Sequence, residues 1–262
     1  MPIERQSVGR VVVGFDPESP ELPALEIAAG LALELQVELA GLYVEDERLL
    51  RFAALPFARE LCFPSASARR VAPEDIERSL RAQAARLRQL MATTAERFAI
   101  SWRLDIVRGE VPGSALSSTG ASDLLVVGGP RYRPLAPEPR ERAAAGRHAL
   151  PARPVVVLFE GSRTAARALA LARDFAARLG SELMVLIPAR DAEAFRKLRR
   201  EAADLLGEAV AVSYMQMPKD GLDAIERALR ARHAAAIFWP RSDDAEIAGL
   251  RARLSLPLVL IG

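Results

Sequence analysis

Two adjacent glycines, Gly128 and Gly129, directly follow the apolar run of residues 124–127. Glycines after a buried strand let backbone N–H groups approach a phosphate, and a following helix N-terminus favours the negative charge. Here the chain continues with a proline and Arg131 instead of further glycines. The segment 123–146 is therefore either a phosphate-binding loop or a degenerate one, and its sequence favours the degenerate loop.

Arginines near this loop offer a second way to hold a phosphate. Guanidinium groups bind phosphate bidentately and need no special backbone geometry. The alternative, which we favour, is a solvated surface formed by these arginines together with Glu138 and Glu141. The arginines concerned are Arg131, Arg133, Arg140, Arg142, Arg147 and Arg153.

A shorter motif, Ser162-Arg163-Thr164, stands at the expected start of a helix. Its hydroxyl and guanidinium groups could bind an anion there. Serine and threonine at such a position are more commonly N-caps, which accept hydrogen bonds from the first turn. The sequence therefore favours a capping role.

Residues suited to catalysis are scarce. The sequence contains no nucleophile elbow, Walker loop or paired-histidine motif. His148 and His233 are the only histidines, and neither has a cysteine or second histidine at the spacing of a zinc site. Asp16 and Glu160 could orient ligand hydroxyls, but no acid–base pair stands at a selective spacing. We expect a protein that is not an enzyme and has no metal site.

The composition limits the class of protein. The chain has 262 residues, of which 36 are basic and 34 acidic, and only 5% are aromatic. This balance does not favour a nucleic-acid partner. The single cysteine, Cys62, excludes an intrachain disulfide and fits a reducing compartment; it is either a buried inert thiol or a reactive one. Without a span-length apolar window or a signal peptide, we expect a cytoplasmic protein with no membrane partner.

Two segments of the chain resemble one another. Residues 11–44 align without a gap with residues 155–188. Composition alone explains some of the shared alanines and leucines but not the common strand–loop–helix–strand register. The sequence therefore predicts a duplicated domain, with one copy in residues 1–150 and the other in residues 151–262. The identical residues in the first copy are Val11, Val12, Val13, Phe15, Ala24, Leu25, Ala28, Ala32, Leu35, Glu38, Leu39 and Leu42.

The first half alternates strands and helices. Periodicity predicts strands at Val11–Phe15 and Glu38–Val44, with a helix at Leu22–Leu35 between them. A long helix follows within residues 73–98, and a half-buried edge strand within residues 101–106, where apolar and polar residues alternate. A short helix within 108–122 and a strand within 123–129 complete this half. The apolar face of the long helix comprises Ile76, Leu80, Leu87, Met91 and Phe98.

The second half alternates in the same way, and strands separated by helices imply parallel crossovers. The fold class predicted is α/β, with two tandem doubly wound parallel-sheet (Rossmann-like) domains. The first half lacks a closing strand, so either Pro154–Phe159 is shared or the first sheet is one strand short. The strands predicted here are Pro154–Phe159, Glu182–Ile187, Val210–Gln216, Ala235–Trp239 and Pro257–Ile261, and the helices are Thr164–Leu179, Ala192–Leu206, Leu222–Arg232 and Glu246–Leu254.

Four phrases, in this order and spacing, resemble the universal stress protein family in a tandem two-domain form that covers nearly the whole chain. They are VVVGFD, which ends at Asp16, LYVED, VRGEVPGSAL, which contains Gly109, and SDLLVVGG. The second half is a weaker match, because it keeps VVVLFEGS but has AAAIFWPRS at the fourth strand. The resemblance implies a five-stranded parallel sheet flanked by helices in each domain.

The resemblance also implies a candidate nucleotide cleft. Asp16 matches the acidic residue near the ribose and adenine, Val44 the second-strand contact with the adenine, and Gly128 the first glycine of an ATP fingerprint found in one branch of the family. That fingerprint is glycine, two residues, glycine, nine residues, glycine and serine or threonine, and neither half contains it. Arg131 stands where its second glycine is expected. The candidate cleft thus comprises Asp16, Val44, Gly109, Gly128, Gly129 and Arg131.

The segment 45–71 interrupts the alternation after the second strand. Its many large apolar residues would be an aggregation hazard in an exposed loop. We therefore expect them to pack over the carboxyl edge of the sheet, against the second domain or against another subunit. The segment is either an irregular helix that completes the core or a lid or interface element. The residues concerned are Leu49, Leu50, Phe52, Leu55, Phe57, Leu61 and Phe63.

Two hypotheses for function follow. The first is a non-catalytic stress-response or regulatory protein that binds an unidentified protein partner and no cofactor. The second is an adenine-nucleotide sensor that holds ATP or AMP in the first-domain cleft. The missing fingerprint favours the first, and Asp16 and Gly109 favour the second. Since family members dimerise through their last strands, the resemblance implies an internal pseudo-dimer of the two domains, with a homodimer as a further option.

Overall fold

The computed structural model divides into two compact units, an N-terminal unit of residues 9–120 and a C-terminal unit of residues 1–8 and 121–262. The predicted domain boundary at residues 150 and 151 lies outside the described part of the chain. The structure describes residues 8–15, 22–55, 57–62, 67–109, 120, 123–128, 153–207, 210–218, 225–227, 229, 234–241, 244–254 and 256–262.

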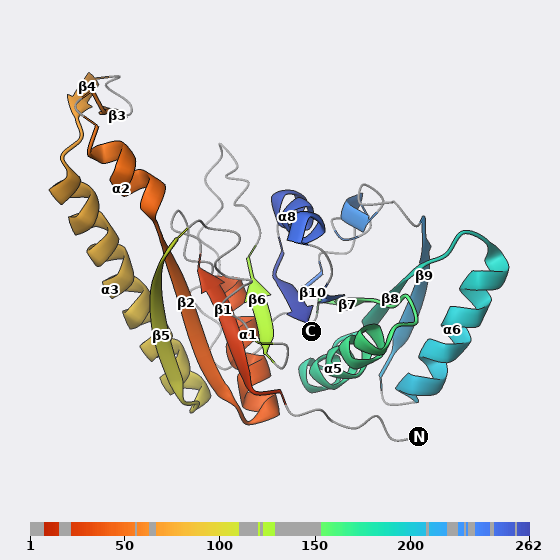
Figure 1. The fold of residues 1–262 in the computed structure, drawn as a ribbon. Helices are drawn as coiled ribbons and strands as arrows, with labels where there is room; N and C mark the ends of the chain where they lie inside the picture. The colour runs from red at the N-terminus through yellow and green to blue at the C-terminus, as the bar shows by residue number, and fades with distance from the viewer. Residues whose placement is uncertain are drawn as a thin grey trace. The chain divides into compact units, whose positions relative to one another are not determined.

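The N-terminal unit contains a parallel sheet with the strand order β5-β2-β1 (Figure 1). Its strands are β1 (Arg10–Phe15), β2 (Glu38–Asp46) and β5 (Trp102–Gly109), and β2 pairs in parallel with both neighbours. Seven consecutive residues of β2 are buried, as expected for a central strand covered on both faces. The three predicted strands are confirmed, and so is the edge position of β5.

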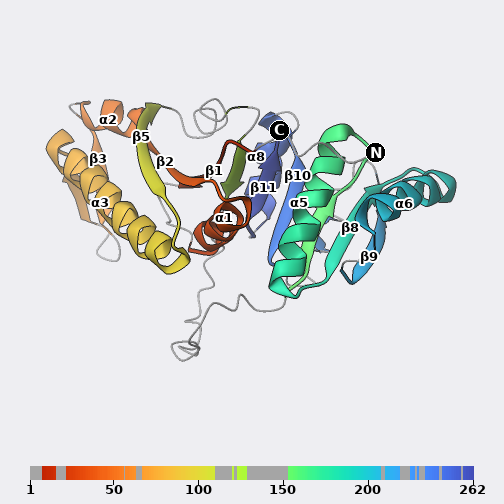
Figure 2. The ribbon, with the colours of Figure 1, turned by 90° about the horizontal axis from the view of Figure 1, so that it is seen from below.

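Two helices cover one face of this sheet (Figure 2). α1 (Leu22–Leu35) has the predicted bounds, and α3 (Pro73–Phe98) packs against α1, β2 and β5. On the predicted apolar face of α3, Leu80, Leu87 and Met91 are buried. The helix approaches β2 closely, because a Cβ on Gly41 would lie 3.2 Å from the Met91 methyl carbon and 2.8 Å from Leu104 Cδ1. A larger residue at Gly41 would therefore separate the helix from the sheet.

Four of the large apolar residues in the segment after β2 are exposed in this chain, so the expected packing over the sheet edge is wrong for them, and packing against another subunit stays a prediction. The segment forms α2 (Glu47–Ala53) and an antiparallel hairpin of β3 (Arg59–Cys62) and β4 (Ser67–Arg70), which project beyond the end of α3 in Figure 1. The small residues Ala53 and Ala58, with Val71, make the buried contact, and Ile76 of α3 packs against them. A helix of seven residues with an alanine at its contact leaves its larger side chains in solvent. Those exposed are Leu49, Phe52, Leu55 and Phe57.

The C-terminal unit contains a sheet with the strand order β6-β11-β10-β7-β8-β9. β7, β8 and β9 are mutually parallel neighbours, and β10 is parallel to both β7 and β11. α5 (Arg163–Leu179) packs on β7, β8 and β10, and α6 (Ala192–Leu206) packs against α5 and β8. α8 (Asp244–Arg253) precedes the last strand. The strands are β6 (Leu124–Val127), β7 (Val155–Leu158), β8 (Leu183–Pro188), β9 (Val212–Met217), β10 (Ala236–Pro240) and β11 (Leu258–Ile261).

The position of β7 resolves the question that the sequence left open. β7 lies between β10 and β8 and is parallel to both, so the segment Pro154–Phe159 belongs to the second sheet. β6 pairs instead with β11, in an antiparallel register that places Leu125 opposite Leu260. Among the described strands of this unit, this antiparallel pair is the one departure from parallel pairing.

The residues shared by the two aligned segments occupy equivalent elements, β1-α1-β2 and β7-α5-β8. Ten of the twelve are buried in both segments, whereas Leu35, Glu38 and their counterparts Leu179 and Glu182 are half-buried. The sequence identity thus coincides with the packing between each helix and its two strands.

Candidate functional site

The structure describes three of the six predicted cleft residues: Val44, Gly109 and Gly128. Asp16, Gly129 and Arg131 lie outside the described residues, as do the arginines of residues 131–147. Gly128 belongs to the C-terminal unit, and Val44 and Gly109 belong to the N-terminal unit. The described geometry therefore falls into two strand edges, one in each unit.

In the N-terminal unit, the structure brings Val44 and Gly109 to the same edge of the sheet. Val44 is opposite Val107 in the register of β2 and β5, and Asp46 is opposite Gly109. Side chains at these paired positions point to the same face because the strands are parallel and in register. The Val44 side chain is only 2% exposed, so a ligand bound at this edge of the sheet would have little direct contact with it.

Asp46 is the last residue of β2, and both of its carboxylate oxygens are hydrogen-bonded to Arg48. Its Oδ1 accepts a hydrogen bond from the Arg48 backbone N–H at 2.9 Å, which makes Asp46 the N-cap of α2. The Arg48 guanidinium donates to both carboxylate oxygens at 3.1 Å. These hydrogen bonds hold the pKa of Asp46 below its usual value, chiefly through the Arg48 side chain. Asp46 was not among the predicted site residues, although an aspartate before a helix start is a recognisable N-cap signal.

A second ion pair lies on the other face of the same edge. Arg108 Nε donates to Glu45 Oε2 at 3.0 Å, and the Glu45 side chain is 11% exposed whereas that of Arg108 is 68% exposed. Nearby, the Tyr43 hydroxyl donates to Gln83 Oε1 at 2.7 Å. Burial, with a smaller contribution from Glu45, raises the pKa of Tyr43 to about 12. Tyr43 is therefore neutral at physiological pH and serves as a structural donor between β2 and α3.

At the equivalent edge of the C-terminal unit, the predicted anion motif is a helix cap. Ser162 Oγ accepts a hydrogen bond from the Ala165 backbone N–H at 3.0 Å and donates to Glu160 Oε1. The capping role favoured for Ser162 is thus confirmed. Glu160, which replaces the aspartate of the first copy, uses one oxygen to hold this cap. The intervening Gly161 has φ +87°, a conformation that L-residues with a Cβ rarely adopt.

The backbone after β10 has few free donors. Trp239 and Pro240 end the strand and both are buried. Pro240 has no backbone N–H, and the N–H of Arg241 donates to the Ile261 carbonyl at 2.6 Å. Two successive positions that could have faced a phosphate are therefore without an available amide.

The environment of Gly128 differs from that of an open phosphate loop. Gly128 follows β6 and is buried. Its carbonyl accepts a hydrogen bond from Arg251 Nε of α8 at 3.5 Å, close to the upper limit for such a bond. This contact involves the carbonyl oxygen of Gly128. A carbonyl oxygen is a hydrogen-bond acceptor and therefore does not attract a negatively charged phosphate.

Sequence reasoning missed Arg167 on α5. Its Nη1 donates to the Gly262 carbonyl at 2.8 Å, whereas its Nη2 is buried without a hydrogen-bond partner among the described residues. The only signal in the sequence is an arginine within the alanine- and leucine-rich stretch of 165–172. A buried unpaired donor of this kind is destabilising unless water or an anion reaches it.

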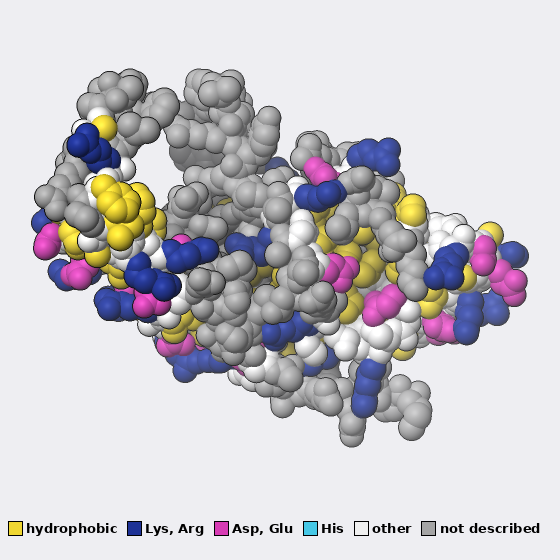
Figure 3. Space-filling view, turned by 45° about the horizontal axis from the view of Figure 1, so that its top comes forward, with side chains coloured by type: hydrophobic (Ala, Val, Ile, Leu, Met, Phe, Trp, Pro, Cys, Tyr) yellow, Lys and Arg dark blue, Asp and Glu magenta, His cyan; other side chains and the backbone are white. Residues whose placement is uncertain are grey.

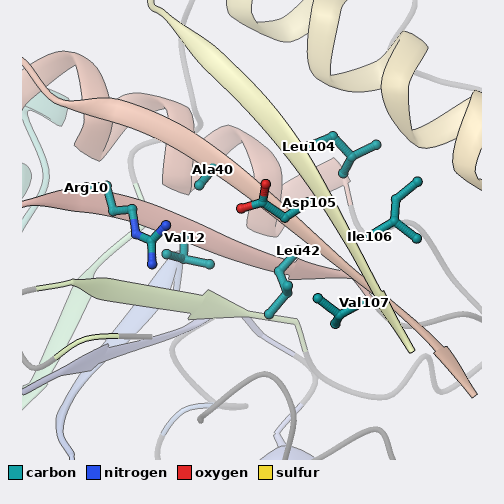
Figure 4. Close-up of a pocket in the computed structure, with 8 residues that line it drawn as sticks. All are labelled: Arg10, Val12, Ala40, Leu42, Leu104, Asp105, Ile106 and Val107. Atoms are coloured by element: carbon teal, nitrogen blue, oxygen red, sulfur yellow. The ribbon is translucent and has the colours of Figure 1, made fainter. Parts of the chain in front are cut away.

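A hollow of about 400 Å³ lies on the sheet face opposite α1 and α3 in the N-terminal unit. Its floor is apolar, with Val12, Ala40 and Leu42 from β1 and β2. Arg10 and Asp105 supply the charges, and Figure 4 shows Leu104 and Ile106 pointing away from the other lining side chains. The lining set contains no histidine, cysteine or hydroxyl group, so it offers a binding surface without a nucleophile. It does not include Val44 or Gly109.

Within the described residues, no group of three histidine, cysteine, aspartate or glutamate side chains is placed to hold a metal ion. Across the same part of the chain, no helix is both long and apolar enough to cross a membrane.

Comparison with solved structures shows the fold of universal stress proteins. A universal stress protein from Archaeoglobus fulgidus DSM 4304 aligns over 97% of this chain and 96% of its own, with a TM-score of 0.58 and 13% sequence identity. A functionally unknown protein, PA1789 from Pseudomonas aeruginosa PAO1, aligns over 98% of this chain and 93% of its own, with a TM-score of 0.50 and 14% identity. The predicted α/β fold class and the resemblance to this fold are confirmed.

Sequence comparisons add no closer relative. No protein-family model matches the chain, and a search of curated proteins gives no match.

Proposed function

We propose that this chain is a non-catalytic stress-response or regulatory protein of the universal stress protein type, and that it lacks a functional binding site for the phosphates of a nucleoside triphosphate. The observation that carries this proposal is the end of β10, where Pro240 lacks an N–H and that of Arg241 is bonded to Ile261. Phosphate cradles in such folds depend on free backbone amides at the carboxyl ends of strands. After β10 the corresponding amides are absent or occupied.

The carboxylates at the two edges support the same proposal. Asp46 and Glu160 are both held by helix-cap hydrogen bonds, Asp46 at α2 and Glu160 through Ser162 at α5. A ligand that used their oxygens would have to displace those bonds. Each cap stabilises the fold by about 1 kcal/mol, and a new hydrogen bond to a ribose hydroxyl contributes about the same. Exchanging one for the other would therefore give almost no net binding energy.

The pairing of β11 with β6 supports an internal partner for the last strand. In isolated domains of this family the last strand is the dimerisation edge, and here that edge of β11 is hydrogen-bonded to Leu124–Val127, which the sequence assigns to the first copy (residues 1–150) although their contacts place them in the C-terminal unit. We therefore propose that the two copies form an internal pseudo-dimer in a cytoplasmic protein.

A thermal-shift titration with ATP, ADP and AMP tests the proposal. A ligand at one hundred times its dissociation constant stabilises a protein by about 2.7 kcal/mol, so binding would raise the melting temperature measurably. We expect no shift with any of the three nucleotides. A universal stress protein that binds ATP serves as the positive control, and a saturable shift with this chain would contradict the proposal.

The second candidate function is an adenine-nucleotide sensor in the N-terminal unit. It is favoured by the edge that Val44 and Gly109 share, where they lie two register positions apart on the neighbouring strands β2 and β5. If a nucleotide shift appears, Asp16→Ala is expected to abolish it. Persistence of the shift in that variant would place the ligand elsewhere.

A further inference from the structure

Four large apolar side chains are exposed on one projecting element of the N-terminal unit. Leu49 and Phe52 of α2 are 45% and 47% exposed, and Leu55 and Phe57, in the turn that follows, are 40% and 73% exposed. These four residues are here called the α2 surface. Figure 3 shows hydrophobic side chains gathered at this end of the unit, with basic side chains beside them. Exposed clusters of this kind mark interaction sites more often than scattered apolar residues do.

The α2 surface is not an unfinished part of the core. The inward side of α2 and of the hairpin base is already filled by Ala53, Ala58 and Val71, which pack with Ile76. α2 is fixed in place by its Asp46 cap and by its contact with α3. The exposed side chains therefore lie outside a contact that is already complete.

Basic residues are frequent in the sequence that carries this surface. Residues 46–70 contain five arginines and three acidic residues, a net charge of +2, which equals the formal net charge of the whole chain. Arg48 and Arg51 remain 57% and 65% exposed despite their surface ion pairs with Asp46 and Glu47. On the hairpin, Arg59 lies directly opposite Arg70.

The combination of phenylalanine, leucine and arginine on a projecting element identifies the partner chemistry. Apolar and aromatic side chains insert at the boundary between headgroups and acyl chains, and arginines attract anionic headgroups. A second copy of the chain fits less well, because its identical surface would bring basic groups against basic groups. A partner helix normally requires a groove, whereas α2 and the hairpin project from the unit in Figure 1.

We propose that the α2 surface docks on an anionic lipid bilayer, with Phe52 and Phe57 entering the interface and the exposed Arg51 and Arg59 contacting the phosphates. This is peripheral binding, and it revises the expectation of no membrane partner, which concerned spanning segments. The inference goes beyond the proposed function and does not rest on it, because vesicle binding requires no conclusion about nucleotides.

Vesicle co-sedimentation with the full chain tests this proposal. Vesicles of phosphatidylcholine alone are compared with vesicles that also contain phosphatidylglycerol. We expect at least tenfold more binding to the anionic vesicles, and most of it should be lost at high salt because headgroup attraction is screened. The double variant Phe52→Ser/Phe57→Ser and the charge reversal Arg59→Glu should each lower binding at least fivefold.

Matched variants elsewhere control for general effects. Leu22→Ser/Leu33→Ser removes two leucines of α1 that are 46% and 43% exposed, and Arg81→Glu reverses a charge on α3 whose side chain is 76% exposed. Neither should change vesicle binding, and circular dichroism verifies the folding of every variant.

Three outcomes would overturn the proposal. They are an absence of binding to anionic vesicles, equal binding to neutral ones, and an equal loss in the control variants. If sedimentation velocity showed instead that Phe52→Ser/Phe57→Ser breaks a self-association without any lipid binding, the surface would be an interface between copies.

Discussion

The segments β1-α1-β2 and β7-α5-β8 share their buried residues but differ in everything that follows the second strand. After β8 the chain enters α6 within a few residues, whereas after β2 it forms α2, the hairpin and then the 26-residue helix α3. The shared part is the contact of one helix with two parallel strands. The difference shows that the same packing of a helix on two strands is kept even when very different segments follow the second strand.

The largest effect is expected for a matched core truncation in the two segments. Leu25 and Leu169 occupy equivalent positions on α1 and α5, and each is 1% exposed. Leu25→Ala and Leu169→Ala should each lower the free energy of unfolding by about 3 kcal/mol, through lost burial and the cavity left behind. Urea denaturation followed by circular dichroism measures both.

Unequal effects of these two truncations would break the comparison. A loss of less than about 1 kcal/mol in one variant and of the full amount in the other would mean that only one segment is tightly packed.

A second test concerns the loop that differs between the segments. Gly161 has φ +87°, and a Cβ there would lie 2.8 Å from Leu198 Cδ2. Gly161→Ala should cost about 2 kcal/mol, mainly through the backbone conformation, since the Leu198 side chain can move. Differential scanning calorimetry measures the change.

The matched control for that variant is Gly249→Ala within α8, where a Cβ meets nothing within 4 Å. It should be neutral or stabilising by up to about 1 kcal/mol, because alanine favours the helix. In a Leu198→Ala background, an unchanged cost of Gly161→Ala would confirm the backbone cause, and its disappearance would refute it.

A third test concerns Tyr43 of β2, because the equivalent residue of β8 has no polar group in its side chain. Tyr43 donates to Gln83, whereas the equivalent residue of β8 is the buried Ile187. Tyr43→Phe should lower stability by about 1 kcal/mol at neutral pH through the lost hydrogen bond.

The same variant has a signature at alkaline pH. The folded-state pKa of Tyr43 is raised from 10.0 to about 12, so the stability it contributes is complete below pH 10 and lost as the pH rises towards 12. Tyr43→Phe should flatten that decline in urea melts taken across this window. A decline identical to that of the parent protein would show that Tyr43 is not its source.

The smallest effect is expected at the helix ends. Gln36 and Gly180 follow α1 and α5 at equivalent positions, with φ of 53° and 61°. Only Gly180 suits this left-handed conformation, so Gln36→Gly should stabilise by about 0.5 to 1 kcal/mol and Gly180→Ala should destabilise by a similar amount. Thermal melting of both variants measures the pair. Destabilisation by Gln36→Gly would indicate that its side chain makes a compensating contact.

Most of the elements could be predicted because their periodicity is strong. Leu22–Leu35 and Ala192–Leu206 have the bounds expected from apolar spacing, and the alternation that begins at Trp102 marked the edge strand β5. Ile106 departs from that pattern, since it is 40% exposed. At an edge strand, alternation predicts the direction of a side chain but not whether anything covers it.

The sequence could not predict the features that depend on long-range pairing. The antiparallel pairing of β6 with β11 joins residues more than 130 positions apart, and no local pattern near Leu124 specifies that direction. The exposure of Phe52 and Phe57 was missed for a related reason, because apolar residues indicate burial only when a partner surface exists. For the candidate site, the sequence placed Val44 and Gly109 at one edge, but it did not reveal that the oxygens of Asp46 are already occupied by Arg48.

The most direct test of the central claim is the nucleotide content of the purified protein. Chain prepared without added nucleotide is denatured, and the released small molecules are quantified by ion-exchange chromatography. We expect far less than one nucleotide per chain, because the amide after β10 is bonded to Ile261 and the Asp46 carboxylate to Arg48. One tightly held ATP per chain would contradict it.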